Sequence, residues 1–154
     1  MNRRLFLVPS ATMLTSLAMS GVHAQNVGKQ VISSPDAPEA IGPYSQAIKS
    51  GKTVYLSGQI AIDPKTKQLM TNASIEDQTR LVLENLKAVL AADGLTLDSI
   101  VSATVFLTDL TDFAKMNEVY ATYFKNTPPA RATVEVAHLP RSAKVEISAI
   151  AVHP

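Results

Sequence analysis

The feature that most constrains the fold of this chain is a change in the spacing of its apolar residues. Between Ser74 and Gly94 the apolar residues recur at steps of three and four, which is typical of an amphipathic helix. Residues 74–77 provide a helix cap and Gly94 a stop signal. Elsewhere, short runs rich in β-branched and aromatic residues predict strands. A chain that mixes the two periods in this way is predicted to form an α+β domain.

Further elements are predicted on both sides of this helix. They are a strand beginning at 31–32, a hairpin of 46–49 and 53–57, a strand over 100–107, a helix capped by Asp109 or Thr111 that continues to 124, and closing strands over 130–137 and 144–152.

The order of these elements, β-β-α-β-α-β-β, predicts two helices packed on one face of a sheet. The closing strand is too apolar in its C-terminal half for a face left in water. We therefore expect that face to meet a neighbouring subunit.

The first 24 residues differ from the rest of the chain. Arg3 and Arg4 precede an apolar run over 5–18, and small residues end at Ala24. This pattern predicts a secretory signal peptide, followed by a single domain over 25–154. Polar residues interrupt the apolar run, so it is too short to anchor the chain in a bilayer. We expect an exported protein of the bacterial periplasm with no membrane association after cleavage; ordinary and twin-arginine export both remain open.

Charge and residue usage exclude several classes of protein. The chain carries 14 basic and 13 acidic residues, and without Arg3 and Arg4 the balance is 12 against 13, a net charge of −1. No basic stripe remains, which argues against nucleic acid as a partner. The sequence holds no cysteine, and His138 and His153 stand alone, so we expect no disulfide, no thiolate chemistry and no metal site.

Tyr44 and Arg131 are candidate functional residues because each follows a rigid proline-containing turn. Tyr44 follows a Gly-Pro turn, and is either a half-buried surface residue or the wall of a pocket. Arg131 follows Pro128 and Pro129 at the start of a strand. There its guanidinium is either a solvated charge or a group that binds a carboxylate through two parallel hydrogen bonds.

Glu146 lies in the closing strand, where alternation places it on one face with Ser148 and Ile150. It is either a solvated carboxylate paired with Lys144 or Arg141, or a group buried against another subunit. In the second case burial would raise its pKa and suit it to act as a general base.

Several separated motifs, taken in order from about 33 to 152, resemble the Rid (reactive intermediate deaminase, YjgF) family. They are Ile41-Gly42-Pro43-Tyr44, Ser57-Gly58-Gln59-Ile60, residues 105–110 leading to Phe113 and Asn117, Pro129-Ala130-Arg131 with Val134-Glu135-Val136, and Lys144-Val145-Glu146-Ile147.

The resemblance implies a chorismate-mutase-like α+β fold assembled as a homotrimer with active sites between subunits. It implies hydrolysis of small 2-imino acids or enamines, such as 2-aminoacrylate, to 2-keto acids and ammonia, without a cofactor. Arg131, Glu146 and Tyr44 would be the catalytic residues, with Arg131 on the substrate carboxylate and Glu146 on the attacking water. The residues expected to line the pocket or contact the substrate are Ser57, Gly58, Asn117 and Thr133.

Two other functions remain as alternatives to hydrolysis. One is an exported ligand-binding protein or holdase that uses the same clefts without turnover. The other is ribonuclease or translation-inhibiting activity, against which export and the lack of a basic surface argue. The chain also departs from the family at Thr133, where many members carry cysteine, so oxidative sensing by that thiol is excluded.

Overall fold

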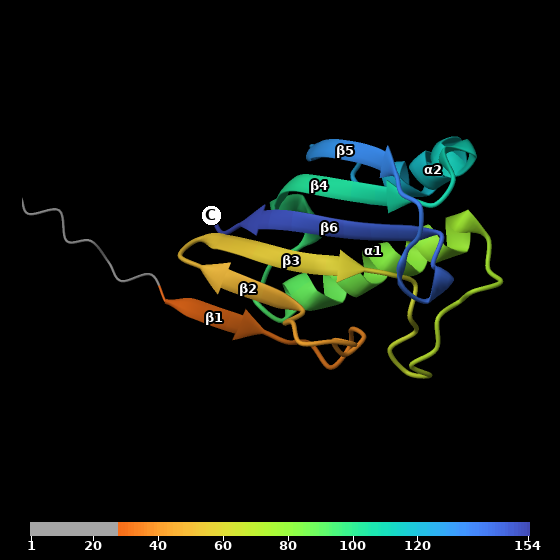
Figure 1. The fold of residues 1–154 in the computed structure, drawn as a ribbon. Coiled ribbons are helices and arrows are strands. Elements are labelled where there is room, and N and C mark those ends of the chain that lie inside the picture. Colours follow the sequence, from red (N-terminus) through yellow and green to blue (C-terminus); the bar gives the residue numbers. More distant parts are fainter. Residues whose placement is uncertain (1–27) are drawn as a thin grey trace, which may run out of the picture.

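The computed structural model describes residues 28–154 as a six-stranded sheet with two helices (Figure 1). The predicted signal peptide, residues 1–24, lies outside the described residues. The elements are β1 (Lys29–Ile32), β2 (Ala47–Ser50), β3 (Thr53–Gln59), α1 (Ile75–Ala91), β4 (Ile100–Leu107), α2 (Phe113–Tyr123), β5 (Ala130–Glu135) and β6 (Val145–Val152), with single 3₁₀ turns at Leu97–Ser99, Leu110–Asp112 and Pro140–Ser142.

The last strand of the chain lies inside the sheet. The strand order is β1-β2-β3-β6-β4-β5, so β6 pairs with β3 on one side and with β4 on the other, both antiparallel. β4 and β5 are parallel neighbours joined through α2. The sheet is therefore mixed, with β1 and β5 as its edges.

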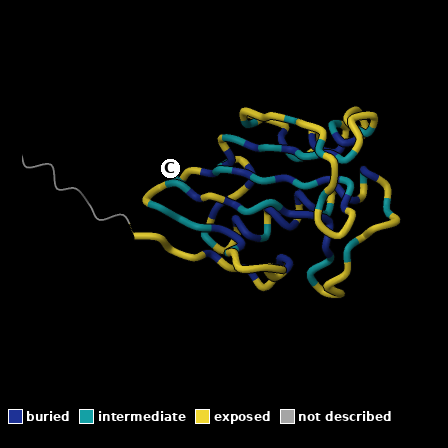
Figure 2. The backbone as a smooth tube through the Cα atoms, in the orientation of Figure 1, coloured by how far each residue is buried: buried dark blue, intermediate teal, exposed yellow. Residues whose placement is uncertain are grey.

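Both helices lie behind the sheet in Figure 1, and no helix of the described residues covers the front face. The core lies between the sheet and the helices, where Leu86 of α1, Val105 of β4 and Ile147 of β6 are all fully buried. On the front face Tyr55 stays 51% exposed. Burial alternates along the central strands, whereas β1 and β5 are mostly exposed (Figure 2). The predicted arrangement of two helices on one face is confirmed.

The residues predicted to begin and end the helices lie at or near the helix ends in the structure. The Ser74 hydroxyl accepts a hydrogen bond from the Asp77 backbone N–H at 3.1 Å and caps α1. Gly94 takes a left-handed φ of 71°, which closes the turn after that helix. Asp109 caps the 3₁₀ turn that leads into α2.

The boundaries differ slightly from prediction. α1 ends at Ala91, three residues before the predicted stop signal at Gly94, because the residues between them form a turn. β5 ends at Glu135 rather than residue 137, because Val136 N–H makes the last bond to β4, at Leu107 C=O. β1 begins at Lys29, two residues before the predicted strand start.

Buried amide side chains fix the loops in front of β2 and after β3. Gln46, 5% exposed, accepts from Ser34 N–H at 2.6 Å and donates to Pro38 C=O at 2.7 Å. Asn85 of α1 donates to the carbonyls of Ile60 and Ile62. The loop that carries Tyr44 and the chain that follows Gly58 are thus held by specific hydrogen bonds rather than by apolar packing alone.

Candidate active site

Glu146 is a half-buried carboxylate on the face of the sheet without helices. Its strand neighbours Val145 and Ile147 point into the core, and its cross-strand partner is Phe106. Burial raises the pKa of Glu146 because the ionised carboxylate loses hydration. The pairing with Lys144 or Arg141 considered from the sequence is not observed: Lys144 Nζ donates to Ala73 C=O at 2.9 Å, and no ion pair of Glu146 occurs within residues 28–154.

Gly58 leaves the space that the Glu146 carboxylate occupies. The register of β3 against β6 shifts between Leu56 and Gln59, which brings Gly58 next to Glu146. A Cβ atom on Gly58 would overlap the carboxylate oxygen and lie 2.7 Å from Cδ and 2.9 Å from Cγ of Glu146. With Glu146 in this position Gly58 has no room for a side chain, so a Cβ atom there would displace the carboxylate.

A pocket of about 300 Å³ opens beside this carboxylate. Tyr44, 47% exposed, forms part of its wall, and its hydroxyl accepts a hydrogen bond from Ile41 N–H at 3.2 Å. The Ser57 hydroxyl donates to Ser45 C=O at 2.7 Å. The full lining consists of Ile41, Tyr44, Ser57, Gly58, Ile60, Pro140 and Glu146.

Arg131 belongs to a second group, formed by the start of β5 and one side of α2. Its Nη2 donates to Asn117 Oδ1 at 2.7 Å, and its Cζ lies 4.4 Å from the centre of the Tyr120 ring. Arg131 has no acidic partner among the residues that the structure describes. A second pocket, of about 440 Å³, lies against this guanidinium and is lined also by Phe124, Pro128 and Pro129. An unneutralised guanidinium at an open pocket is suited to bind an anion.

Two buried hydroxyl groups accompany Arg131. Thr133 lies two residues further along β5, and its Oγ1 is buried without a hydrogen-bond partner within the described chain. The same holds for the hydroxyl of Tyr120. Desolvation raises the pKa of Tyr120, although the nearby charge of Arg131 opposes the rise, so the hydroxyl stays protonated at neutral pH.

The sequence interpretation missed Tyr120 as part of this site. Its spacing from Asn117 and Phe124, three and four residues, is that of an ordinary helix face, and the sequence motifs give it no role. The available signal is that Tyr120 lies one helical turn after Asn117, on the side of the helix that faces Arg131.

The sheet separates the two groups within one chain. Arg131 pairs with Ala103 and Thr133 with Val105, both on the core side, whereas Glu146 pairs with Phe106 on the opposite side. The fold therefore brings together Tyr44, Ser57, Gly58 and Glu146 at one pocket. It brings Asn117 and Arg131 into contact, with Thr133 on the same face of the sheet, but the two groups lie on opposite faces. One chain therefore carries a half-buried carboxylate at one pocket and an unneutralised guanidinium at another.

Neither helix in residues 28–154 is long and apolar enough to cross a membrane. Within that same range no three His, Cys, Asp or Glu side chains gather as a metal site would require.

Comparison with known proteins gives consistent matches over most of the chain. A family model described as endoribonuclease L-PSP matches residues 34–153. A RutC family protein of Pyrococcus horikoshii is 54% identical over 123 residues, covering 80% of this chain and 97% of that protein. A 2-iminobutanoate/2-iminopropanoate deaminase of Mus musculus is 47% identical over 124 residues, covering 80% and 91%. The crystal structure of E. coli TdcF with bound serine superposes with a TM-score of 0.77 at 47% identity, covering 81% of this chain and 99% of that one.

Proposed function

Because this chain belongs to the Rid family, also called the YjgF, RutC or endoribonuclease L-PSP family, we propose that it hydrolyses 2-imino acids to 2-keto acids and ammonia. Enamine tautomers such as 2-aminoacrylate would be substrates after conversion to the imine. The similarity to a mouse protein named as an imino acid deaminase supports this reaction. The bound serine in E. coli TdcF supports a small amino-acid-like ligand.

The observation that carries the proposal is the pair of uncompensated charges. Glu146 is half-buried without an ion-pair partner in residues 28–154. Its pKa is raised towards neutral pH, and a general base is most effective when its pKa lies near the working pH. Arg131 keeps its charge unneutralised beside an open pocket. Hydrolysis of a substrate that carries a carboxylate needs a cation to bind that carboxylate and a base to activate the attacking water.

We also propose that the working site forms between two copies of the chain in a homotrimer. The sheet separates Arg131 from Glu146, so a site that uses both needs Arg131 from a neighbouring copy. The face without helices supports such contacts, because a row of apolar side chains crosses four of its strands. This row consists of Val31, Ile48, Tyr55 and Ile150.

In the proposed mechanism Arg131 binds the carboxylate of the imino acid and orients its imine carbon towards a water molecule held by Glu146. As the water oxygen attacks the imine carbon, the C=N electron pair moves to nitrogen and Glu146 takes a proton from the water. Glu146 then returns the proton to the nitrogen of the carbinolamine. Glu146 next takes the hydroxyl proton and delivers it to the amino nitrogen, the C=O bond forms as the C–N bond breaks, and ammonia and the keto acid are released.

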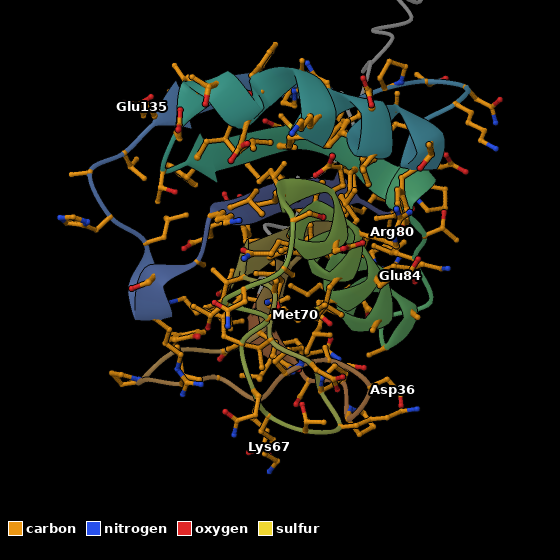
Figure 3. All side chains as sticks on the ribbon, turned by 90° about the vertical axis from the view of Figure 1, so that its right-hand side faces the viewer. Asp36, Lys67, Met70, Arg80, Glu84 and Glu135 are labelled. Atoms are coloured by element: carbon orange, nitrogen blue, oxygen red, sulfur yellow. The ribbon has the colours of Figure 1, made fainter. Side chains whose placement is uncertain are left out.

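The test is release of ammonia and keto acid from imines generated in situ by an amino-acid oxidase. The protein is compared with Arg131→Ala, with Glu146→Gln and with a control, Arg80→Ala, on the outer side of α1 (Figure 3). We expect losses of roughly 100-fold or more for Arg131→Ala and for Glu146→Gln, and no change for the control. Activity should fall as the pH decreases through the raised pKa of Glu146, because the protonated carboxyl cannot accept a proton.

No acceleration over the uncatalysed rate with small, branched and aromatic imines would contradict the hydrolase. Retained keto-acid binding without turnover would then favour a ligand-binding or holdase protein. Salt-sensitive RNA cleavage that depends on Arg131 would favour the activity named in the family description.

A further inference from the structure

We propose that Tyr120 positions Arg131 for carboxylate binding. The contact that does so is made by the face of the Tyr120 ring and not by its hydroxyl. This inference rests on the proposed function and adds a residue to its site. Tyr120 also lines the pocket beside Arg131, and in this proposal it acts through that guanidinium.

The geometry places a rigid aromatic surface against the guanidinium. Arg131 Cζ lies 4.4 Å from the centre of the Tyr120 ring, within the range of a cation–π contact. The ring is 5% exposed and stacks on Phe124 with a centroid separation of 4.4 Å and an interplanar angle of 27°. Because the ring is buried and stacked, it cannot move away from Arg131 without disturbing the end of α2.

This way of holding an arginine leaves its hydrogen-bond donors available. A guanidinium has five N–H donors, and a cation–π contact with the face of an aromatic ring leaves them free of hydrogen-bond acceptors. Within residues 28–154, Arg131 makes one side-chain hydrogen bond, from Nη2 to Asn117 Oδ1 at 2.7 Å. An acidic partner would hold the arginine equally well, but it would occupy the paired donors and neutralise the charge. A neutral amide and an aromatic face fix the orientation while the charge and the remaining donors stay ready for the substrate.

The hydroxyl of Tyr120 contributes little to this arrangement. It is buried and forms no hydrogen bond of normal geometry within the described residues, although the guanidinium of Arg131 lies close enough to oppose the rise in its pKa. Burial raises its pKa, so it carries no charge that could attract Arg131 at neutral pH. Replacing a buried, unpaired hydroxyl with hydrogen is close to neutral for folding. The chain therefore allows the ring and the hydroxyl to be tested separately.

The experiment compares Tyr120→Phe, which keeps the ring, with Tyr120→Leu, which removes it. Tyr123→Leu is the matched control, because Tyr123 lies on the same helix and its hydroxyl donates to Glu84 of α1 instead. The affinity for 2-oxobutanoate, an unreactive carboxylate, is measured by calorimetry alongside kcat and KM for imine hydrolysis. Folding is checked by circular dichroism and thermal unfolding.

We expect Tyr120→Leu to weaken 2-oxobutanoate binding roughly 5- to 30-fold and to raise KM more than it lowers kcat. Tyr120→Phe should stay within about twofold of the parent, as should Tyr123→Leu. The ring-current shift of the Arg131 Nε–H signal in NMR spectra should persist in Tyr120→Phe and disappear in Tyr120→Leu. This last readout needs neither turnover nor ligand.

A folded Tyr120→Leu protein with parental affinity and an unchanged Arg131 signal would overturn the proposal and leave Tyr120 as a core residue. Equal losses in Tyr120→Phe and Tyr120→Leu would overturn it too, because the hydroxyl would then be the working part. Failure of the parent to hydrolyse imines would instead contradict the proposed function, while the NMR comparison would still decide the role of Tyr120.

Discussion

At the scale of single residues, the site depends on the absence of a side chain as much as on the presence of one. Glu146 is half-buried because its carboxylate lies over Gly58, in the volume where a Cβ atom would otherwise be. The φ angle of Gly58 is not in the left-handed region, so the backbone there does not demand glycine. What demands it is the carboxylate, and a substitution at this position reports directly on the placement of Glu146.

We expect Gly58→Ala to reduce imine hydrolysis on the order of 100-fold, because the new methyl group forces Glu146 away from the attacking water. Gly28→Ala is the control, since a Cβ at Gly28 meets no atom within 4 Å. Steady-state kinetics and thermal unfolding of both variants check the prediction. A fully active Gly58→Ala enzyme would show that Glu146 works from another rotamer or is not the base.

At the scale of elements, the loop that carries Tyr44 is held by one buried side chain. The amide of Gln46 accepts from Ser34 N–H and donates to the carbonyls of Ser34, Ala37 and Pro38. These bonds join the chain after β1 to the start of β2, across a stretch without regular secondary structure. The hydrogen bonds of Gln46 therefore hold in place the loop that forms a wall of the Glu146 pocket.

We expect Gln46→Glu to lower the free energy of unfolding by about 2–3 kcal/mol, because a carboxylate would face three carbonyl oxygens without a proton to donate. The same replacement at the exposed Gln68 should change stability by less than about 0.5 kcal/mol. Urea unfolding of the two variants measures the difference. Equal stabilities would mean that water penetrates the loop and replaces the amide.

At the scale of the whole molecule, the sheet divides the site. Arg131, Thr133 and Asn117 lie towards the helices, whereas Tyr44, Ser57 and Glu146 lie towards the opposite side. No loop of the described chain brings Arg131 and Glu146 into one pocket. The proposed chemistry therefore requires a second copy, and inactive variants of the two halves should complement each other.

We expect mixed trimers of co-expressed Arg131→Ala and Glu146→Gln chains to regain about one third of the parental activity, since each mixed trimer pairs an intact Arg131 with an intact Glu146 at one of its three sites. Each variant by itself should stay inactive. Activity of mixed assemblies, separated by two different affinity tags, is the measurement. Mixed assemblies as inactive as either parent variant would place the whole site within one chain.

The sequence by itself determined the elements and the family. The helical spacing after Ser74, the Asp109 cap and the alternation around Glu146 are local patterns, fixed by residues close together in the chain, and the structure bears them out. The motifs around Tyr44, Gly58, Arg131 and Glu146 identified the family, which the comparisons confirm. The predicted signal peptide stays a prediction.

Only the tertiary structure decided how these residues meet. The placement of β6 between β3 and β4 depends on pairing across most of the chain, which no local pattern encodes. That placement puts Glu146 over Gly58 and leaves Arg131 on the opposite face of the sheet. The role of Tyr120 was hidden for the same reason, since a buried tyrosine on a helix differs from any other only through the guanidinium that the fold sets against it.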